Sequence, residues 1–521
     1  MHGADFFAKC LPSSRNGLGP IFVRRTFELI LPARPHGTPS AKWLRNSLSG
    51  EIASGRLTPG SLLPGSRDLA RQYRLSRGTV VAAIDELTAE GYLESRAGSG
   101  TYVSRVLPEH LLHSHRSSTK RTAGTGRRQK FSDWSARVEP FSYHIRPGNA
   151  AFRTNLPALD LFPTKLWARV AARRLRKASS RLLLGCHPLG HWPLRKAVAE
   201  YLRTARGVTC SDNQVIIVSG IQEALDLVAR LLLNRGDRVL IEDPGYQGAY
   251  AVFDAAGARL QSVEIDDDGA CPKKGAFRNS RLLYVTPGHQ FPMGTTMSHS
   301  RRLFLLDCAQ KHGTVIFEDD YDGEFRYSGR PLQALQGLDQ CDSVIFAGSF
   351  NKVLFPSLRL GYMVLPNQMI DAFSSAKAMT SRHHPLLEQA VLCDFINEGH
   401  FDRHIRKMRK IYSQRLAVLV ESAGLHLAQY LDLSPIEAGM QTVGMLRDGI
   451  CAEAVAKKAA IQNIDVVPLQ RYCRTASVTN GLQIGFAAVD EKQIKAGVLT
   501  LARVLKKMAS QVSGDRTSGP V

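Results

Sequence analysis

Apolar residues recur at helical spacing near the start of the chain. Leu44, Leu48 and Ile52 repeat every four residues and predict one amphipathic helix. Two shorter helices are predicted, one beginning near Ser66 and one that Ser76 caps. Two short strands around a glycine-containing turn follow them. Three helices and a β-hairpin are typical of a winged helix-turn-helix.

The pattern changes further along the chain, where short β-branched runs alternate with amphipathic helical stretches. Runs such as 215–218 and 344–347 have the length and composition of buried strands. This alternation predicts parallel βαβ units and an α/β domain. The predicted organisation is an extension of uncertain order (1–38), a winged helix-turn-helix domain (39–104), a basic flexible linker (105–145), an α/β domain (146–508) and a disordered tail (509–521).

Positive charge is concentrated near the N-terminus. The chain has 68 Lys and Arg against 46 Asp and Glu, a net charge of +22, and residues 1–130 hold 20 of the basic and 9 of the acidic side chains. This asymmetry indicates an anionic polymer partner, and double-stranded DNA fits it. The sequence contains no long apolar run and no secretion signal at its start, which predicts a cytoplasmic, nucleoid-associated protein with no membrane partner. The nine cysteines form no Cys-x-x-Cys pair, so no metal site is expected.

The winged-helix region contains a family motif. The segments LPGSRDLA at 63–70, SRGTV at 76–80 and GSGT at 98–101 strongly resemble GntR-family transcription regulators. Arg67 is predicted to reach a phosphate at the start of the second helix, and Arg96 to reach the minor groove or the backbone from the wing. The resemblance implies that the residues at the matching positions contact DNA, namely Arg67, Ser76, Arg77, Thr79 and Gly98.

Charged and polar residues also stand at the ends of predicted buried strands. The acidic run EDDYD follows the strand at 314–317, and acids crowded in this way require a cationic partner. Lys352 lies between two apolar runs, where a lysine is rarely buried without a partner or a covalent role. The segment 219–222 opens a helix whose N-terminus suits a phosphate. A lysine for an aldehyde, a carboxylate for a ring nitrogen and a phosphate site are together what pyridoxal phosphate requires.

The order of these segments resembles fold-type I pyridoxal-phosphate (PLP) enzymes of the class I/II aminotransferase group, which implies a mixed, mostly parallel sheet. By this resemblance Lys352 forms the Schiff base with PLP and Asp319 pairs with the pyridine nitrogen. Tyr321 would bond the ring hydroxyl, and Tyr246 would lie against the ring face. The residues implied for the phosphate are Gly220, Ile221, Gln222, Ser349 and Arg359.

The union of the two domains resembles the MocR subfamily of GntR regulators. The shared segments are EDPGY at 242–246, HQFP at 289–292 and EDDYDGEF at 318–325. The resemblance implies a homodimeric transcription regulator that binds PLP. Its small-molecule effector would be PLP itself, an amine or an amino acid.

Three departures from the aminotransferase pattern bear on catalysis. Gln483 stands where aminotransferases place a carboxylate-binding arginine, and glutamine binds a carboxylate far less strongly. Phe291 replaces the asparagine that bonds the ring hydroxyl, and Gly185 replaces a tyrosine. These changes put efficient transamination in doubt. Two alternatives to a PLP-responsive regulator stay open: an active aminotransferase that carries a DNA-binding domain, and a cofactor-free dimerisation scaffold.

Overall fold

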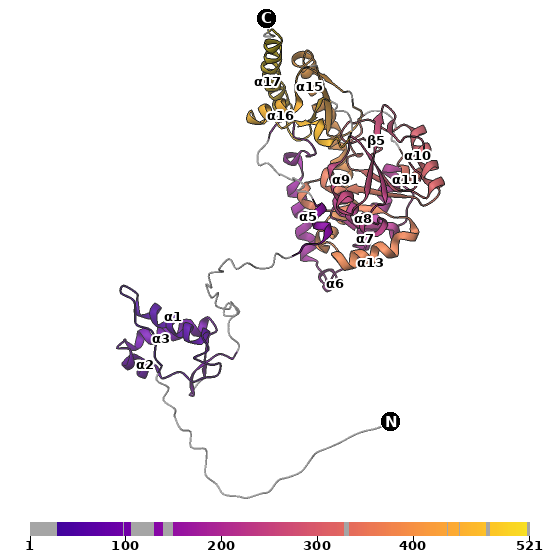
Figure 1. Ribbon diagram of the computed structural model, residues 1–521. Helices are drawn as coiled ribbons and strands as arrows, with labels where there is room; N and C mark the ends of the chain where they lie inside the picture. Colours follow the sequence, from indigo (N-terminus) through magenta and orange to yellow (C-terminus); the bar gives the residue numbers. More distant parts are fainter. Residues whose placement is uncertain are drawn as a thin grey trace, which may run out of the picture. The chain divides into compact units, whose positions relative to one another are not determined.

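The chain divides into two compact units, Met1–Arg128 and Gln129–Val521 (Figure 1). The computed structural model describes residues 29–96, 98–105, 130–138, 150–327, 333–434, 436–447, 449–475 and 480–517.

Three helices and a two-stranded antiparallel sheet form the smaller unit. The predicted apolar face is buried, since Leu44 and Leu48 have no exposed surface and Leu69 and Val80 join them in one core. Ser76 caps the third helix by accepting a 3.1 Å hydrogen bond from the Thr79 N–H. The elements are α1 (Ser40–Ala53), α2 (Ser66–Gln72), α3 (Arg77–Ala89), β1 (Leu93–Arg96) and β2 (Gly100–Val103).

The end of the predicted extension is part of this unit, so the boundary at residue 39 is wrong. Leu29 and Leu31 are buried in the core of the winged helix. The Trp43 indole N–H donates to the Pro32 carbonyl at 3.1 Å, and the side chains of Gln72 and Tyr73 bond the Leu29 carbonyl. We call residues 29–32 the strap. The rest of the extension, 1–28, lies outside the described residues.

An eight-stranded mixed sheet organises the larger unit. Its order is β3-β10-β9-β8-β7-β4-β5-β6, and the inner pairs from β9 through β8, β7 and β4 to β5 are parallel. The pairs that involve β10 and β6 are antiparallel, so the predicted mixed, mostly parallel sheet is confirmed. The strands are β3 (Val215–Val218), β4 (Arg238–Glu242), β5 (Arg259–Asp266), β6 (Gly269–Cys271), β7 (Ser280–Val285), β8 (Val315–Asp320), β9 (Val344–Ser349) and β10 (Gly361–Val364).

Both faces of this sheet are covered. Along β3, Val215 and Ile217 enter the core that contains Leu194 of α7, whereas Ile216 and Val218 enter the core that contains Leu225 of α8. Continuous apolar strands therefore reflect burial on two sides. The helices are α4 (Asp133–Arg137), α5 (Thr164–Arg176), α6 (Ser180–Leu184), α7 (Trp192–Arg206), α8 (Ile221–Leu232), α9 (Gln247–Ala255), α10 (His299–His312), α11 (Leu335–Leu338), α12 (Phe350–Val353), α13 (Ile370–Thr380) and α14 (Leu386–Asn397).

A second sheet with three more helices forms the lobe that carries the C-terminus, drawn in orange to yellow in Figure 1. The predicted disordered tail is wrong over residues 509–517, because α17 continues through them. Its buried positions Val498, Leu501 and Leu505 keep helical spacing, and Lys458 donates to the Gln511 side chain at 2.9 Å beyond them. The elements are β11 (Leu431–Leu433), β12 (Gln441–Leu446), β13 (Val467–Pro468), β14 (Gly481–Gly485), α15 (His400–His426), α16 (Ala452–Ile461) and α17 (Glu491–Thr517).

The predicted flexible linker also needs correction. Residues 133–137 form α4, which is fixed to the larger unit by a 3.0 Å bond from Arg137 Nε to the Ala255 carbonyl at the end of α9. Residues 106–129 and 139–149 lie outside the described part of the chain. Within the described residues, no helix combines the length and apolarity that a membrane crossing requires.

Candidate functional site

Lys352 occupies a short helix at the carboxyl end of β9. Its Nζ donates a 3.1 Å hydrogen bond to the Asn155 carbonyl. Burial lowers the pKa of Lys352 to about 8, although the nearby carboxylates of Asp322 and Asp319 act in the opposite direction. An amine with a pKa this low is partly neutral near pH 7, which makes it a competent nucleophile for an aldehyde.

Asp319 is a buried carboxylate with one unused acceptor. Its Oδ2 accepts a 2.7 Å bond from the Tyr284 hydroxyl, whereas Oδ1 has no hydrogen-bond partner among the described residues. Burial raises the pKa of Asp319 to about 7, against the effect of the Tyr284 bond. A buried, unpaired carboxylate oxygen is rare in folded proteins, and a protonated ring nitrogen would satisfy it.

Gly220 and Ser349 meet at the same edge of the sheet. Gly361 of β10 pairs with Ser349 of β9 on one side and with Val218 of β3 on the other, which brings the start of α8 beside the end of β9. Gly220 has a φ of +143°, and a Cβ there would lie 2.8 Å from the Asn351 side-chain nitrogen. Only glycine therefore leaves room at the N-terminus of α8, where backbone N–H groups are free for an anion.

Arg359 reaches the same corner. Its Nη2 donates to the Ser219 hydroxyl at 3.5 Å, and its own φ of +51° is left-handed. Asn351 ties the corner together by donating to the Ser219 carbonyl at 2.8 Å and accepting from the Leu360 N–H at 3.0 Å. Gly220, Ser349 and Arg359 are thus brought together, as predicted for a phosphate site. Sequence reasoning missed Asn351, the neighbour of Lys352.

Aromatic side chains line the approach to these groups. The Tyr246 hydroxyl donates to Gln222 Oε1 at 3.1 Å, which places the predicted ring-stacking tyrosine beside the first turn of α8. Phe291 packs edge-on against Tyr246 and Tyr321, with ring centroids 5.9 and 5.8 Å away. The aromatic Phe291 that stands in place of asparagine therefore joins the wall of the site as an apolar group.

Tyr321 is bonded to a histidine that the sequence did not single out as a site residue. His289 Nδ1 lies 2.9 Å from the Tyr321 hydroxyl and 3.1 and 3.2 Å from the two carboxylate oxygens of Asp322. All three side chains are buried. This network holds the Tyr321 hydroxyl in place.

The acidic run at 318–322 has the cationic partner that the sequence predicts. The strand β8 extends further than predicted and ends at Asp320, so the first acids of the run belong to the strand itself. Arg206 of α7 forms a two-pronged ion pair with Asp320, with N–O distances of 2.5 and 2.6 Å. Asp320 is neutralised in this way, and Asp319 is left as the carboxylate available to a ligand.

Gln483 lies on β14, in the sheet of the lobe that carries the C-terminus. The side chain is fully buried, its Oε1 accepts a 2.8 Å bond from the Tyr472 hydroxyl, and its Nε2 has no partner within the described residues. Tyr472 packs against Phe291 with ring centroids 5.0 Å apart. The position that departs from the aminotransferase pattern thus presents a neutral amide donor next to the aromatic wall.

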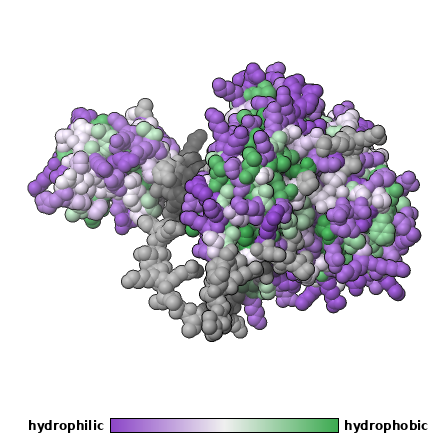
Figure 2. All heavy atoms as spheres, turned by 90° about the horizontal axis from the view of Figure 1, so that it is seen from above, coloured by the Kyte–Doolittle hydropathy of each residue, from purple (hydrophilic) through white to green (hydrophobic). Residues whose placement is uncertain are grey.

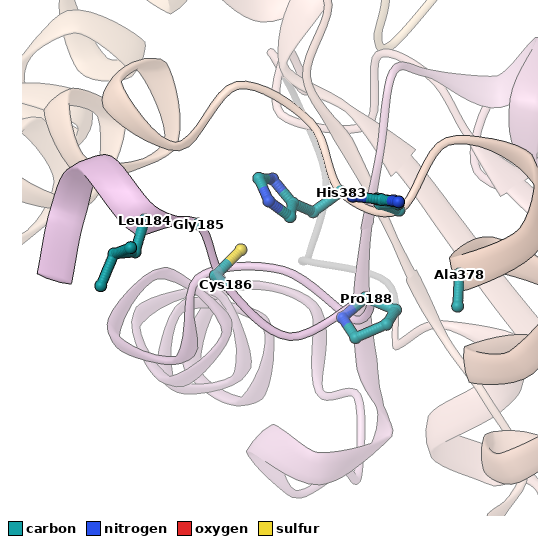
Figure 3. A pocket seen from close by; sticks show the side chains of 7 residues that line it. Leu184, Gly185, Cys186, Pro188, Ala378 and His383 are labelled. Carbon is teal, nitrogen blue, oxygen red and sulfur yellow. The ribbon is translucent and has the colours of Figure 1, made fainter. Parts of the chain in front are cut away.

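Gly185 lies at the rim of a surface hollow of about 480 Å³ (Figure 3). In Figure 3 the His383 ring lies over the Gly185–Cys186 turn. A Cβ on Gly185 would lie 2.7 Å from His383 Nε2, and its φ is +120°. The glycine that replaces a tyrosine is therefore required by the packing of His383.

The predicted DNA-contacting residues of the smaller unit are solvent-exposed or nearly so. Ser76 and Thr79 bond one another through their hydroxyls at 2.8 Å at the start of α3, and Arg77 between them is exposed. Arg67 is exposed on α2. The first turn of α3 therefore presents a cation and free backbone N–H groups, as a recognition helix does.

The wing orients its arginine. The guanidinium of Arg96 lies 4.7 Å from the centroid of the Tyr102 ring, and Gly98 makes the turn with a φ of +74°. The Tyr102 hydroxyl is 2.8 Å from the Ser99 hydroxyl. The sequence did not single out Tyr102 as a site residue either.

Comparison with known proteins decides the family. A model described as aminotransferase class I and II matches residues 155–501, and one described as bacterial regulatory proteins, gntR family, matches residues 42–103. The probable rhizopine catabolism regulatory protein MocR of Rhizobium meliloti is 39% identical over 471 residues, 90% of this chain and 94% of that protein. The chain belongs to the MocR subfamily of GntR-type transcriptional regulators.

Other relatives of this MocR-type chain agree. The HTH-type transcriptional regulator TauR of Rhodobacter capsulatus is 30% identical over 89% of this chain and 96% of its own length. The solved structure of LysN, an α-aminoadipate aminotransferase of Thermus thermophilus in complex with N-(5'-phosphopyridoxyl)-L-leucine, superposes with a TM-score of 0.67 and 29% identity over 73% of this chain and 98% of that one. The MocR-type chain is a DNA-binding regulator whose larger unit has the fold-type I aminotransferase-like architecture.

Proposed function

We propose that the larger unit binds PLP at Lys352 and that this binding controls how the winged helix of the same chain engages promoter DNA. The observation that carries the proposal is the partly buried Lys352, whose amine has a lowered pKa, together with the buried Asp319, whose Oδ1 lacks a partner among the described residues. The corner around Gly220 and Arg359, with the N-terminus of α8 and a guanidinium, supplies groups that suit the phosphate of PLP. The residues present therefore fit the cofactor.

Each residue has a separate task in this proposal. When bound, PLP supplies an aldehyde and an electron-withdrawing ring. Lys352 would provide the amine, and Asp319 would accept a hydrogen bond from the ring nitrogen and keep it protonated. Tyr321 would donate to the ring hydroxyl, and Tyr246 would lie against one ring face. The predicted phosphate contacts are Gly220, Ile221, Gln222, Ser349 and Arg359.

The effector would enter beside Gln483. An arginine there would bind a carboxylate through two charge-assisted bonds, but the amide of Gln483 offers neutral N–H donors and no charge. The surrounding aromatic rings of Phe291 and Tyr472 favour an amine with an apolar or neutral polar body. PLP alone, or such an amine, is the effector class that this wall supports.

A homodimer would hold two winged helices for two DNA half-sites. Leu183 and Leu184 of α6 are 75% and 86% exposed, and Leu175 at the end of α5 is also exposed. Figure 2 shows apolar side chains, in green, gathered on one face of the larger unit. Exposed leucines on adjacent helices are typical of a subunit interface. The dimer would act at promoters, in association with the nucleoid.

Two measurements test the proposal. Borohydride reduction of the full chain with PLP, followed by peptide mapping, should label Lys352, and Lys352→Ala should remove the label while Lys492→Ala, an exposed lysine of α17, keeps it. A titration of the DNA region upstream of the gene, with and without PLP, should give two different affinities for the wild type and one for Lys352→Ala. Labelling of another lysine, or equal affinities in the wild type, would reject the proposal.

Aminotransferase activity is the second candidate, and the Lys352–Asp319 pair favours it. The neutral Gln483 opposes it because an amino-acid substrate brings a carboxylate. Steady conversion of an amino acid and a 2-oxo acid by the wild type, with Gln483→Arg as a comparison, distinguishes the two. We expect no measurable turnover in the wild type.

A further inference from the structure

The larger unit carries its own concentration of positive charge. Residues 164–184, which include α5 and α6, contain seven Lys and Arg and no Asp or Glu. Residues 400–410, the start of α15, contain five Lys and Arg and one acid, Asp402. Neither segment belongs to the cofactor site or to the winged helix.

The two helices meet at a surface hollow of about 570 Å³, lined by Lys165 and Arg169 of α5, Lys407 of α15 and the carboxylate-bearing Asp160. Lys165 and Arg169 are four residues apart and share one side of α5. On α15, Arg403, Lys407 and Lys410 are spaced by four and three residues and therefore share one side of the helix. We define the basic face as the exposed residues Lys165, Arg169, Arg403, Lys407 and Lys410.

None of these five side chains forms an ion pair with a carboxylate of the described residues. On the neighbouring side of α5, by contrast, Arg174 pairs with Asp394 at its Nε, 2.8 Å away, and Arg173 pairs with Glu398. Like charges one helical turn apart repel by roughly 0.2–0.5 kcal/mol per pair. The basic face therefore holds uncompensated charge at a cost in stability, which a polyanion would relieve.

We propose that the basic face binds the phosphate backbone of the same duplex that the winged helix recognises, as a second contact that does not depend on sequence. The inference rests on the proposed function only for the identity of the polyanion. DNA bound by one unit is held at high effective concentration for the other unit of the same chain. Lys and Arg contacts to phosphate add affinity by releasing counterions.

A lipid surface fits the basic face less well. An interfacial helix must present apolar side chains beneath its basic ones. On α5, Val170 is buried and Trp167 packs against Phe355 and Phe395, with ring centroids 5.5 and 5.3 Å away. At the end of α5 that carries the basic face, the apolar side is therefore occupied by the protein's own core, and the exposed Leu175 lies at the other end of the helix.

The test uses the full-length protein and two duplexes of equal length, the region upstream of its gene and a scrambled version. The variant Lys165→Glu/Arg169→Glu/Lys407→Glu is compared with the matched control Lys492→Glu/Lys495→Glu/Lys506→Glu, three exposed lysines of α17 that give the same change in net charge. The dissociation constant is measured from about 50 to 200 mM salt, a range over which phosphate contacts change affinity strongly. PLP absorbance of each variant reports an intact larger unit.

Three lost phosphate contacts should lower the slope of log affinity against log salt by about 2.7, since each contact contributes about 0.9. Affinity should fall at least tenfold, and by the same factor on both duplexes, while the control changes the slope by less than about 1. The milder Lys165→Gln/Arg169→Gln/Lys407→Gln variant should show the same trend if the reversed charges disturb the fold.

Equal slopes for the test and control variants would overturn the inference. Loss of binding to vesicles of anionic lipid with unchanged DNA slopes would also overturn it and would indicate a membrane partner. Failure of the proposed function appears differently, as a wild type whose affinity for the upstream duplex is the same with and without PLP. Arg77→Ala should reduce the preference for the upstream duplex over the scrambled one and leave the contribution of the basic face to the salt slope intact.

Discussion

The two units place their functional residues in opposite environments. In the winged helix, Arg67, Arg77 and Arg96 are exposed side chains outside the hydrophobic core, and Arg96 lies over the ring of Tyr102. In the larger unit, Asp319 is buried, Lys352 is partly buried, and both are bonded to the fold itself. A predicted DNA-contacting residue can therefore change with little effect on stability. A residue of the proposed cofactor site contributes to the stability of the cofactor-free protein, and that contribution is unfavourable for Asp319.

The largest expected effect comes from Asp319→Asn. Burial raises the pKa of Asp319 to about 7 from an ordinary value of 3.8. The stability linked to its protonated form is fully present below about pH 4 and is lost as the pH rises through 7. At pH 8 the ionised carboxylate therefore lowers the free energy of unfolding of the cofactor-free protein by several kcal/mol, since each pKa unit corresponds to about 1.4 kcal/mol. The asparagine variant should therefore gain thermal stability over the wild type, and the gain should grow from pH 5 to pH 8.

The same variant should lose PLP affinity at least tenfold at pH 8, because the ring nitrogen loses a charged acceptor. Thermal melts with and without PLP measure both effects. Asp371→Asn, an exposed acid at the start of α13, should change neither. A variant with lower stability at pH 8 would contradict the assignment of Asp319 as a buried, uncompensated charge.

Leu29→Ala should produce the next largest effect. It tests whether the stability of the smaller unit also depends on a single buried residue. Leu29 is 3% exposed in the core of the smaller unit. Its truncation should destabilise that unit by about 2–4 kcal/mol and leave PLP binding unchanged. Two separate calorimetric transitions would report this, with only the transition of the winged helix shifted. Ile30→Ala, at 83% exposure, is the matched control.

The strap also shows why its part of the fold escaped sequence analysis. Periodicity predicted α1, α2 and α3 because each buries a repeated face and Ser76 marks a helix start. Leu29 and Leu31 form no repeat, and their partner Tyr73 lies more than forty residues away. A short irregular segment with two buried leucines carries no local signal.

Sequence analysis likewise revealed only part of the candidate cofactor site. The strand ends and the order of the motif segments allowed Lys352, Asp319 and Gly220 to be predicted together. Asn155 and Tyr284 were missed, since Asn155 acts through a backbone carbonyl and Tyr284 looks like an ordinary strand residue. Residue type alone does not reveal that the Asn155 carbonyl accepts from Lys352 or that the Tyr284 hydroxyl donates to Asp319. Only the tertiary arrangement shows these two contacts.

Arg77→Ala should weaken specific DNA binding by about 1–3 kcal/mol, roughly 5- to 150-fold, with little effect on a scrambled duplex. Because Arg77 is exposed, the melting temperature should stay unchanged. Lys42→Ala, an exposed lysine of α1, controls for the loss of one positive charge. Equal weakening on both duplexes would mean that Arg77 contacts phosphate instead of a base.

The smallest effect should come from Tyr102, which acts on DNA only through Arg96. The ring lies under the guanidinium at 4.7 Å, and such a contact contributes about 0.5–1 kcal/mol at an exposed site. Tyr102→Leu removes the ring and should weaken binding about two- to fivefold, but only while Arg96 is present. Tyr102→Phe keeps the ring and should bind like the wild type. If Tyr102→Leu also weakened DNA binding by an Arg96→Ala protein, the tyrosine would act by stabilising the wing itself. The exposed site of the smaller unit would then depend on a residue that also stabilises the fold, as the site of the larger unit does.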